Sequence, residues 1–415
     1  MLSGVYAKWM KAWETNLTTR DSNRIVRPLD WGFDWLKDFN NGDEAACDRP
    51  ESPGNRGSDS SEPAIGPRSQ DLERMIALNE EIARCSGGFF DYRVPHDFRI
   101  ENRLPELFPT NVRPETLAQD AEMKRQGAVG DLVEAQFLRF TSAIHTPYPE
   151  NNQVNARWYP ASGHQHSKKR SSQPRQAIIV LPQWNADAIS HNALCSLFNR
   201  FGISALRLSK PYHDIRRPAE LERSDFAVSA NVGRTIAACR QAVIDIRSCL
   251  DWLESQGYSQ FGILGTSLGS CYAFIAAAHD PRLRVCAFNH ASTWFGDVVW
   301  TGQSTRHVRT AFENSGLTQS DVRKIFLGIS PMAYMERFAS TPRRALVVHA
   351  KYDLTFLPEY SIDILANFRR HGVDFVSKVL PCGHYTTGET PYKYLDGWYL
   401  GSFIYRSFRD LAECR

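Results

Sequence analysis

The sequence lacks any hydrophobic run that approaches the roughly 20 apolar residues of a membrane-spanning helix. Its amino terminus, MLSGVYAKWMKAWETNLTTRDSNR, also lacks the apolar stretch and small-residue cleavage site of a secretory signal. These absences predict a cytoplasmic protein. Val5, Trp9, Met10, Trp13 and Leu17 do recur at helical spacing beside Lys8 and Lys11, which leaves two alternatives open. The helix packs on the body of the protein, as we expect, or lies at a membrane surface.

An excess of one charge and a cluster of metal-binding residues are likewise missing. Lys and Arg number 49 against 46 Asp and Glu, a net charge of +3, which argues against a nucleic-acid partner. The nine cysteines form no CxxC pair, and cysteines such as Cys239, Cys249, Cys271 and Cys286 lie singly in apolar stretches. We therefore expect reduced, buried thiols, no metal site and no cofactor.

The composition changes along the chain and indicates its organisation. Residues 43–70 are rich in Pro, Ser, Gly and charge, which predicts a flexible linker within an N-terminal extension, residues 1–125. From residue 126 to residue 415, apolar strand-like segments alternate with helix-like segments. This alternation is typical of a three-layer α/β domain, with a mostly parallel central sheet and helices on both faces.

The motif that carries chemistry is FGILGTSLGSCYAFIAAA, a buried strand, then Gly265-Thr266-Ser267-Leu268-Gly269, then an Ala-rich helix. A serine on a sharp turn between strand and helix has its hydroxyl lifted clear of the sheet, and only small neighbours fit such a turn. The glycines do not form the G-x-G-x-x-G pattern of dinucleotide-binding folds. From residue 126 onward the chain resembles the α/β-hydrolase superfamily, whose serine esterases and lipases carry this G-x-S-x-G nucleophile elbow.

The resemblance implies a base and an acid in the chain order Ser, Asp, His. Asp353 follows the apolar strand in RRALVVHAKYD, and His384 lies in the loop after DFVSKVLP. Ser267, Asp353 and His384 are therefore the predicted catalytic residues. His290, His307 and His349 are the competing bases, but His290 and His307 precede Asp353, and His349 lies within a strand.

The oxyanion of acyl transfer needs two backbone amides, which the resemblance assigns to Leu268 and Trp184. Leu181-Pro182-Gln183-Trp184-Asn185 departs from the His-Gly pattern usual in that loop, because Pro182 and Gln183 replace those residues. A strand-free insertion at about 294–340 is predicted to form a helical lid over the serine. Gln183, His213, Trp294 and Phe295 are candidate pocket residues, while Arg306, His307 and Arg309 are candidates to bind a carboxylate or phosphate.

The sequence thus predicts a serine hydrolase that cleaves a carboxylic ester or related acyl substrate through an acyl-serine intermediate. Its partner is a small acyl compound, and neither the substrate nor the oligomeric state can be deduced from the sequence. Two alternatives remain open. An acyltransferase would use the same three residues with an acceptor other than water, and a non-catalytic hydrolase-like scaffold would bind a partner through its Trp-rich extension.

Overall fold

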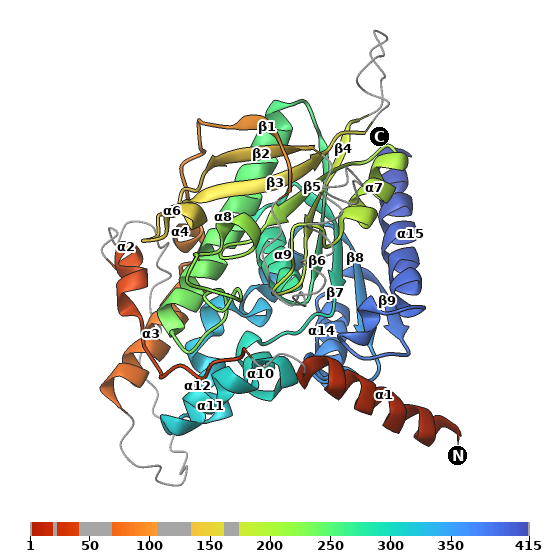
Figure 1. Ribbon diagram of the computed structural model, residues 1–415. Coiled ribbons are helices and arrows are strands. Elements are labelled where there is room, and N and C mark those ends of the chain that lie inside the picture. Colours follow the sequence, from red (N-terminus) through yellow and green to blue (C-terminus); the bar gives the residue numbers. More distant parts are fainter. Residues whose placement is uncertain (1, 20–22, 41–68, 106–133, 162–173, 414–415) are drawn as a thin grey trace, which may run out of the picture.

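The computed structural model describes residues 2–19, 23–40, 69–105, 134–161 and 174–413. Its central element is a nine-stranded sheet with the order β1-β2-β3-β5-β4-β6-β7-β8-β9 (Figure 1). The strands are β1 (Arg99–Arg103), β2 (Ala135–Thr141), β3 (Gln153–Tyr159), β4 (Gln176–Leu181), β5 (Ser204–Ser209), β6 (Gln260–Thr266), β7 (Leu283–Asn289), β8 (Arg344–Ala350) and β9 (Asp374–Leu380). The pairs from β5 to β9 are parallel, and β1, β2, β3 and β5 pair antiparallel. The predicted α/β class with a mostly parallel sheet is confirmed.

Two hydrophobic cores cover the two faces of this sheet and make the three layers. The long helices that form them are α7 (Asn192–Arg200), α8 (Val232–Ser255), α9 (Leu268–His279), α14 (Pro358–Arg370) and α15 (Tyr392–Glu413). One core joins α8, α9 and α14 to the sheet, and the other joins α7 and α15 to it. The central strands β4 and β6 are buried on both faces, which is why they are nearly continuous apolar runs.

The predicted lid is wholly helical in the structure. Its elements are α10 (Phe295–Thr301), η5 (Gln303–Thr305), α11 (Arg306–Asn314), α12 (Gln319–Ile325), η6 (Leu327–Ile329), η7 (Pro331–Tyr334) and α13 (Met335–Ala339). Phe295, Phe312 and Phe326 pack edge to face within it, so the insertion has an apolar centre of its own. It follows β7 directly and therefore lies at the carboxyl edge of the parallel strands.

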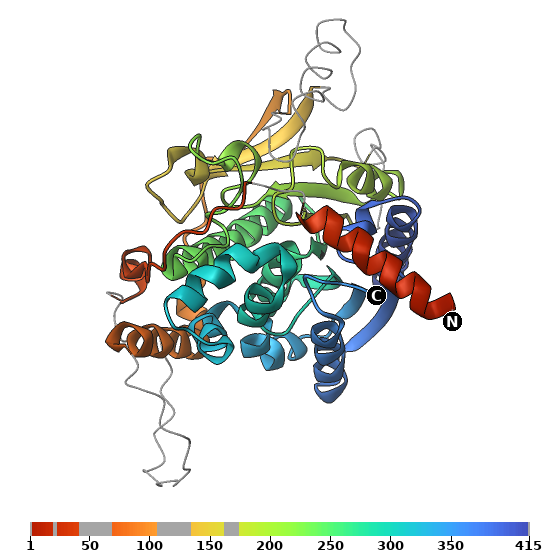
Figure 2. The ribbon, with the colours of Figure 1, turned by 60° about the horizontal axis from the view of Figure 1, so that its bottom comes forward.

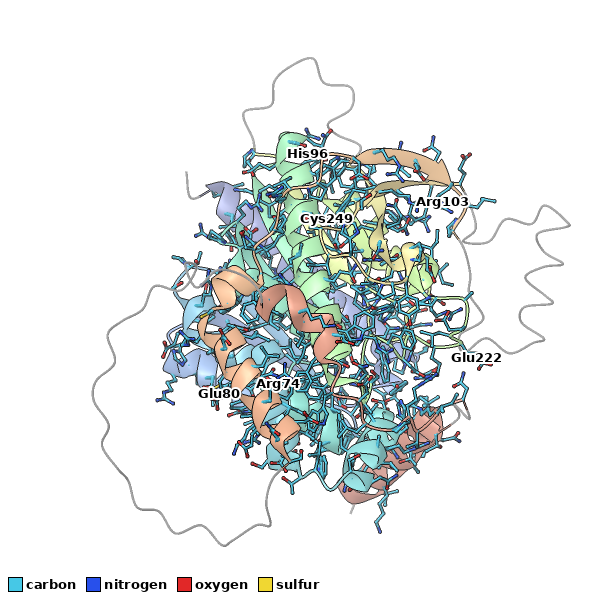
Figure 3. All side chains as sticks on the ribbon, turned by 90° about the vertical axis from the view of Figure 1, so that its left-hand side faces the viewer. Arg74, Glu80, His96, Arg103, Glu222 and Cys249 are labelled. Carbon is cyan, nitrogen blue, oxygen red and sulfur yellow. The ribbon has the colours of Figure 1, made fainter. Side chains whose placement is uncertain are left out.

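The N-terminal extension packs on this body rather than standing apart. It contains α1 (Leu2–Thr19), η1 (Phe33–Leu36), α2 (Lys37–Asn40), α3 (Gln70–Arg84), α4 (Ser86–Phe89) and the edge strand β1. Helix α3 contacts α12 and η6 of the lid, and η1 contacts α8. Figure 3 shows α3, with Arg74 and Glu80 labelled, on the same side of the molecule as α8, which carries Cys249. The linker predicted at 43–70 lies outside the described residues except for Ser69 and Gln70, which begin α3.

Several sequence expectations need correction here. The charged segment RIENR was not predicted as a strand, but it forms β1. In α1, Val5 and Trp9 are exposed, whereas Met10, Glu14 and Thr18 are fully buried, so the buried face is rotated from the predicted stripe. Six described cysteines are free and buried, as expected, but Cys85 is disulfide-bonded. No helix among the described residues is long and apolar enough to cross a membrane.

Candidate active site

The turn between β6 and α9 gives Ser267 an unusual backbone conformation. Its φ and ψ are 56° and −120°, a region that non-glycine residues rarely adopt and that lifts the side chain off the sheet. The Ser267 amide donates to Asn289 O at 2.8 Å, which fixes the turn to the end of β7. The flanking glycines are required by packing, since a Cβ on Gly265 would lie 2.1 Å from Gly269 O. A Cβ on Gly269 would lie 2.4 Å from Leu181 O.

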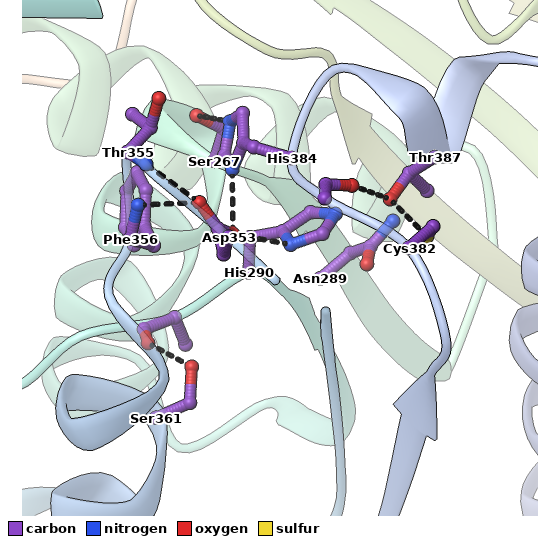
Figure 4. Close-up of polar contacts among 12 residues, drawn as sticks. Ser267, Asn289, His290, Asp353, Thr355, Phe356, Ser361, Cys382, His384 and Thr387 are labelled. Carbon is purple, nitrogen blue, oxygen red and sulfur yellow. Dashed lines mark hydrogen bonds and ion pairs between the residues drawn. The ribbon is translucent and has the colours of Figure 1, made fainter. Parts of the chain in front are cut away.

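Three side chains from different strand ends meet at this turn (Figure 4). The Ser267 hydroxyl lies 3.0 Å from His384 Nε2, and His384 Nδ1 lies 2.9 Å from Asp353 Oδ2. Asp353 follows β8 and His384 follows β9, so neighbouring strands deliver both groups to the same edge of the sheet. With its proton on Nδ1, His384 donates to Asp353 and presents Nε2 as the acceptor for the Ser267 hydroxyl.

The Asp353 carboxylate is fully enclosed by donors. Its Oδ1 accepts the amides of Thr355 and Phe356 at 2.8 and 2.7 Å, and its Oδ2 accepts His384 Nδ1 and His290 Nδ1. Burial alone would raise the pKa of Asp353, but the two histidines more than offset this and lower the pKa well below its usual range. Burial likewise opposes protonation of His384, yet the Asp353 charge and hydrogen bond raise the pKa of His384 above its ordinary value. The pair therefore favours a carboxylate beside an imidazole that accepts a proton readily.

The competing histidines occupy other positions. His290, at the end of β7, contacts Asp353 at 3.1 Å, and its ring lies 4.5 Å from the His384 ring, but His384 holds the contact to Ser267. His307 stacks on Trp184, and burial, followed by the charges of Arg24 and Arg223, lowers its pKa to about 3. His349 lies within β8. His290 is thus a second donor to the acid, a contact that the chain order Ser, Asp, His does not indicate.

The two amides assigned to the oxyanion lie at the ends of β4 and β6. Leu268 is the first residue of α9, and the amides of a first helical turn have no acceptor within the helix. The Trp184 loop is fixed by its neighbours: the Trp184 indole donates to Ser224 O at 3.0 Å, and the Asn185 side chain accepts the Ser224 amide at 2.7 Å. Asn185 has φ of 57°, so this loop makes a tight turn without the usual His-Gly pair. Both Trp184 and Leu268 line the pocket above Ser267.

This pocket is mostly apolar and contains about 490 Å³ of empty space, part of which is open to solvent. Its lining residues are Trp184, Val228, Ser267, Leu268, Cys271, Ser292, Phe295, Val298, Val299, Ser304, Thr305, Pro331, Thr355 and Phe356. Many come from the lid, so the insertion forms much of the wall.

The structure separates the four candidate pocket residues. Phe295 lines the pocket, but Gln183, Trp294 and His213 do not. Trp294 is covered by the Arg323 guanidinium, and the Gln183 carbonyl accepts Lys210 Nζ at 2.9 Å. His213 is buried, with Nδ1 2.8 Å from Pro211 O. Of the four candidates, Phe295 therefore lines this pocket, and the other three residues are not among its lining residues.

Among the described residues, one group has a geometry that could hold a metal ion. Its members are His290, Asp353 and His384, with ligand atoms within 4.8 Å of one another. Asp353 Oδ2 accepts a hydrogen bond from each ring, so hydrogen bonds connect the three side chains in this structure. The sequence expectation that no metal is needed stays a prediction.

Comparisons with known proteins agree with this architecture. The family model "Alpha/beta hydrolase domain containing 18" matches residues 190–320. An uncharacterized 31.7 kDa Escherichia coli protein from the traX-finO intergenic region is 30% identical over 106 residues, which are 24% of this chain and 36% of that protein. The chain therefore aligns with little more than a third of that relative.

Solved structures of similar shape include acetyl xylan esterase 1 from Thermoanaerobacterium sp. JW/SL YS485, with 14% identity, a TM-score of 0.49 and coverage of 82% of this chain and 95% of that one. A Pyrococcus horikoshii acylaminoacyl peptidase has 12% identity and a TM-score of 0.48, over 66% of this chain and 41% of that one. The strand order and the family-model match confirm the resemblance to the α/β-hydrolase superfamily, whose fold this chain has.

Proposed function

We propose that this protein is a serine hydrolase that cleaves a carboxylic ester or a related acyl compound. The observation that carries the proposal is the continuous hydrogen-bonded chain from Ser267 Oγ through His384 to the Asp353 carboxylate. A serine hydroxyl is a weak nucleophile until a base accepts its proton, and this arrangement supplies the base together with an anion that orients it.

In the proposed reaction, Ser267 Oγ attacks the acyl carbonyl carbon while its proton moves to His384 Nε2. The amides of Leu268 and Trp184 donate to the oxyanion, and Asp353 offsets the imidazolium charge. His384 then gives its proton to the leaving group as the carbonyl–oxygen bond breaks, which leaves an acyl-Ser267 ester. A water molecule, deprotonated by His384, hydrolyses this ester and returns Ser267 to its starting state.

The shape of the pocket supports an acyl chain as the occupant. Leu268, Phe295, Val298, Val299 and Phe356 present apolar surface beside Ser267. Burial of a methylene group there contributes about 0.8 kcal/mol to binding. An acyl chain that reaches these side chains is therefore favoured over a polar one.

The test combines covalent labelling with turnover, so that its result does not depend on the choice of ester. A fluorophosphonate probe should label the wild-type protein at Ser267, and a series of acyl esters of graded chain length should show which are hydrolysed. Ser267→Ala and His384→Ala should each abolish turnover while circular dichroism shows an unchanged fold. Wild-type protein that takes no label, or a Ser267→Ala variant with wild-type turnover, would refute the proposal.

We also propose that the protein works in the cytoplasm. Six free, buried cysteines among the described residues support a reducing compartment, whereas the disulfide at Cys85 is typical of an oxidising one. Fractionation of cells that express the full chain separates the two compartments. Recovery of the protein in the cytosolic fraction supports the proposal, and recovery from a membrane-enclosed or secreted fraction contradicts it.

A further inference from the structure

Helix α1 lies against the loop that carries His384, although the two segments are at opposite ends of the sequence (Figure 2). The residues that face the body recur every four positions: Tyr6, Met10, Glu14 and Thr18. The Tyr6 hydroxyl contacts Pro381 O at 2.5 Å and the Tyr392 hydroxyl at 2.7 Å. The helix therefore contacts the loop (residues 381–391) at its first residue and contacts α15 directly after the loop ends.

Glu14 makes the central contact of this interface. Its side chain is fully buried, with Oε1 accepting the Tyr385 amide at 2.8 Å and Oε2 accepting the Thr386 amide at 3.0 Å. A Cβ built on Gly383 would lie 2.4 Å from Glu14 Oε2, so the loop backbone fits closely around the carboxylate. The carboxylate thus contacts Gly383, directly before His384, and Tyr385 and Thr386, the two residues that follow it.

Hydrogen bonds within the same loop also stabilise it, and the contacts with Glu14 add to them. The Gly383 amide donates to Thr386 Oγ1 at 2.6 Å, and Thr386 Oγ1 contacts Met10 Sδ at 3.4 Å. The amides of Tyr385 and Thr386 donate to Glu14, and no backbone carbonyl among the described residues accepts either amide. Without Glu14, one buried and one partly buried donor beside His384 would lose their acceptor, at a cost in free energy.

Charge adds to this geometry. Burial raises the pKa of Glu14, while the two amides and the His384 charge oppose that rise. Four titratable side chains face His384. They are Asp353 and His290 from the strand ends, Glu14 from α1, and Tyr385, the next residue in the chain. Asp353 and Glu14 both favour the imidazolium, and Glu14 is the acid that also holds the loop backbone.

Helix α1 also contacts the other side of the pocket. The Thr18 hydroxyl donates to Gln303 Oε1 at 2.8 Å, and Gln303 precedes the pocket-lining residues Ser304 and Thr305. One helix from the N-terminal extension thus links the histidine loop to the lid. A displacement of α1 would be transmitted to both the base and the pocket wall.

We propose that Glu14 is a positioning residue for His384: its carboxylate holds the two amides that follow the histidine and sets the imidazole at bonding distance from Ser267. This inference rests on the proposed function, because it concerns the base of that reaction. It assigns to the N-terminal extension a part in catalysis, since a misplacement of the base by about 1 Å can cost a hundredfold in rate.

The test measures the rate of fluorophosphonate labelling of Ser267 from pH 5 to pH 9 in the full chain. Glu14→Gln is nearly isosteric, but its NH2 group faces amide donors and its charge is gone. We expect labelling at pH 8 to be slower by about tenfold or more, and the acid limb of the profile to move to lower pH, because the imidazolium loses a favourable anion. The matched control is Glu80→Gln on α3, an exposed glutamate on the far side of the molecule that should leave the profile unchanged (Figure 3).

A second variant separates loop geometry from charge and covers a loss of folding in the first. Glu14→Asp keeps the anion but is one carbon shorter, so it should slow labelling while leaving the acid limb near its wild-type pH. Glu14→Gln with the profile of Glu80→Gln, or Glu14→Asp labelled at the wild-type rate, would overturn the inference alone. Wild-type protein without label would instead overturn the proposed function, and this inference with it.

Discussion

Asp353 accepts hydrogen bonds from four N–H donors, two backbone amides on one oxygen and two imidazoles on the other. The amides of Thr355 and Phe356 fix one oxygen, so the other oxygen points at the two imidazoles. A carboxylate with this many donors stays ionised through the pH range of most enzymes, as its lowered pKa indicates. The amides of its own loop therefore hold Asp353 in place independently of its contact with His384.

Asp353→Asn should lower kcat/KM by about 10³-fold to 10⁴-fold, by analogy with triad enzymes. The Asn side chain can turn an NH2 group toward His384, which would place the imidazole proton on Nε2, where it cannot accept the Ser267 hydroxyl. Steady-state kinetics on the best ester of the graded series would measure the loss, with the melting temperature as a check on folding. An Asn variant with wild-type kinetics would remove Asp353 from the proposed mechanism.

Substitution of His290 should affect stability according to whether a donor remains. His290 has φ of 57°, a left-handed conformation that Asn tolerates and β-branched or bulky residues do not. His290→Asn can keep both the backbone and a donor toward Asp353, whereas His290→Leu loses both. We expect the Leu variant to be less stable than the Asn variant by about 1–3 kcal/mol, measured by urea denaturation. Equal stabilities would show that the His290 contact with Asp353 contributes little.

At the scale of elements, the turn between β6 and α9 depends on how closely α9 approaches the end of β4. Gly269 faces Leu181 O and Pro182 O, and Gly265 faces the backbone of Gly269, so both glycines serve close packing rather than positive φ. The positive φ belongs to Ser267 itself. The surrounding backbone therefore maintains the strained serine.

Gly269→Ala should destabilise the protein by about 2 kcal/mol or more, because α9 must move to relieve the clash with Leu181 O. The labelling rate of Ser267 should fall with it, since the Leu268 amide moves as well. Gly397→Ala in α15 is the matched control: a Cβ there has no atom within 4 Å, and the helix should gain about 0.5–1 kcal/mol. Thermal melts and Ser267 labelling rates of the two variants measure the difference. Equal effects of the two substitutions on stability and on labelling would contradict the prediction.

The elements that sequence analysis located are those whose signal is local. Ser267 and Asp353 each follow a buried apolar strand, and His384 follows the last strand, so the chain order and the strand ends are sufficient to select them. Strand β1 was missed because RIENR is a charged edge strand, stabilised by pairing with β2 and by ion pairs such as Arg99 with Glu101. In α1, apolar spacing selected Trp9, whereas tertiary contacts bury Glu14, which is 371 positions from the Tyr385 amide. No periodicity in the sequence could reveal a buried acid whose partners are backbone amides.

At the scale of the whole molecule, the site is assembled from segments that span nearly the entire chain. Helix α1, the β6–α9 turn, the lid and the histidine loop all meet at the carboxyl edge of the sheet (Figures 1 and 2). Folding must therefore be nearly complete before His384 faces Ser267. A partly buried acid, Asp396, whose carboxylate accepts a hydrogen bond from Asn289, shows how pH affects the fold.

Asp396→Asn should stabilise the protein more at high pH than at low pH. Burial, only partly opposed by a hydrogen bond from Asn289, raises the pKa of Asp396 to about 7, against about 3.9 in an unfolded chain. Between these values the folded state holds a proton that the unfolded state has lost, so wild-type stability decreases as pH rises from about 4 to 7 and regains nothing above it. Asn carries no such penalty, and its amide can donate to Asn289 Oδ1, which has no hydrogen-bond partner among the described residues.

Urea denaturation of both proteins at pH 5 and pH 8 measures this effect, because contributions from all other groups cancel in the difference between variant and wild type. The gain in free energy of unfolding should be larger at pH 8 than at pH 5 by about 2–3 kcal/mol, because the two states differ in ionisation over the two pH units from 5 to 7. A gain that is the same at both values would mean that Asp396 titrates alike in the folded and unfolded states. The Asn289 carbonyl accepts the Ser267 amide, so labelling kinetics on the same samples should show whether relief of this buried charge also changes the turn that carries the nucleophile.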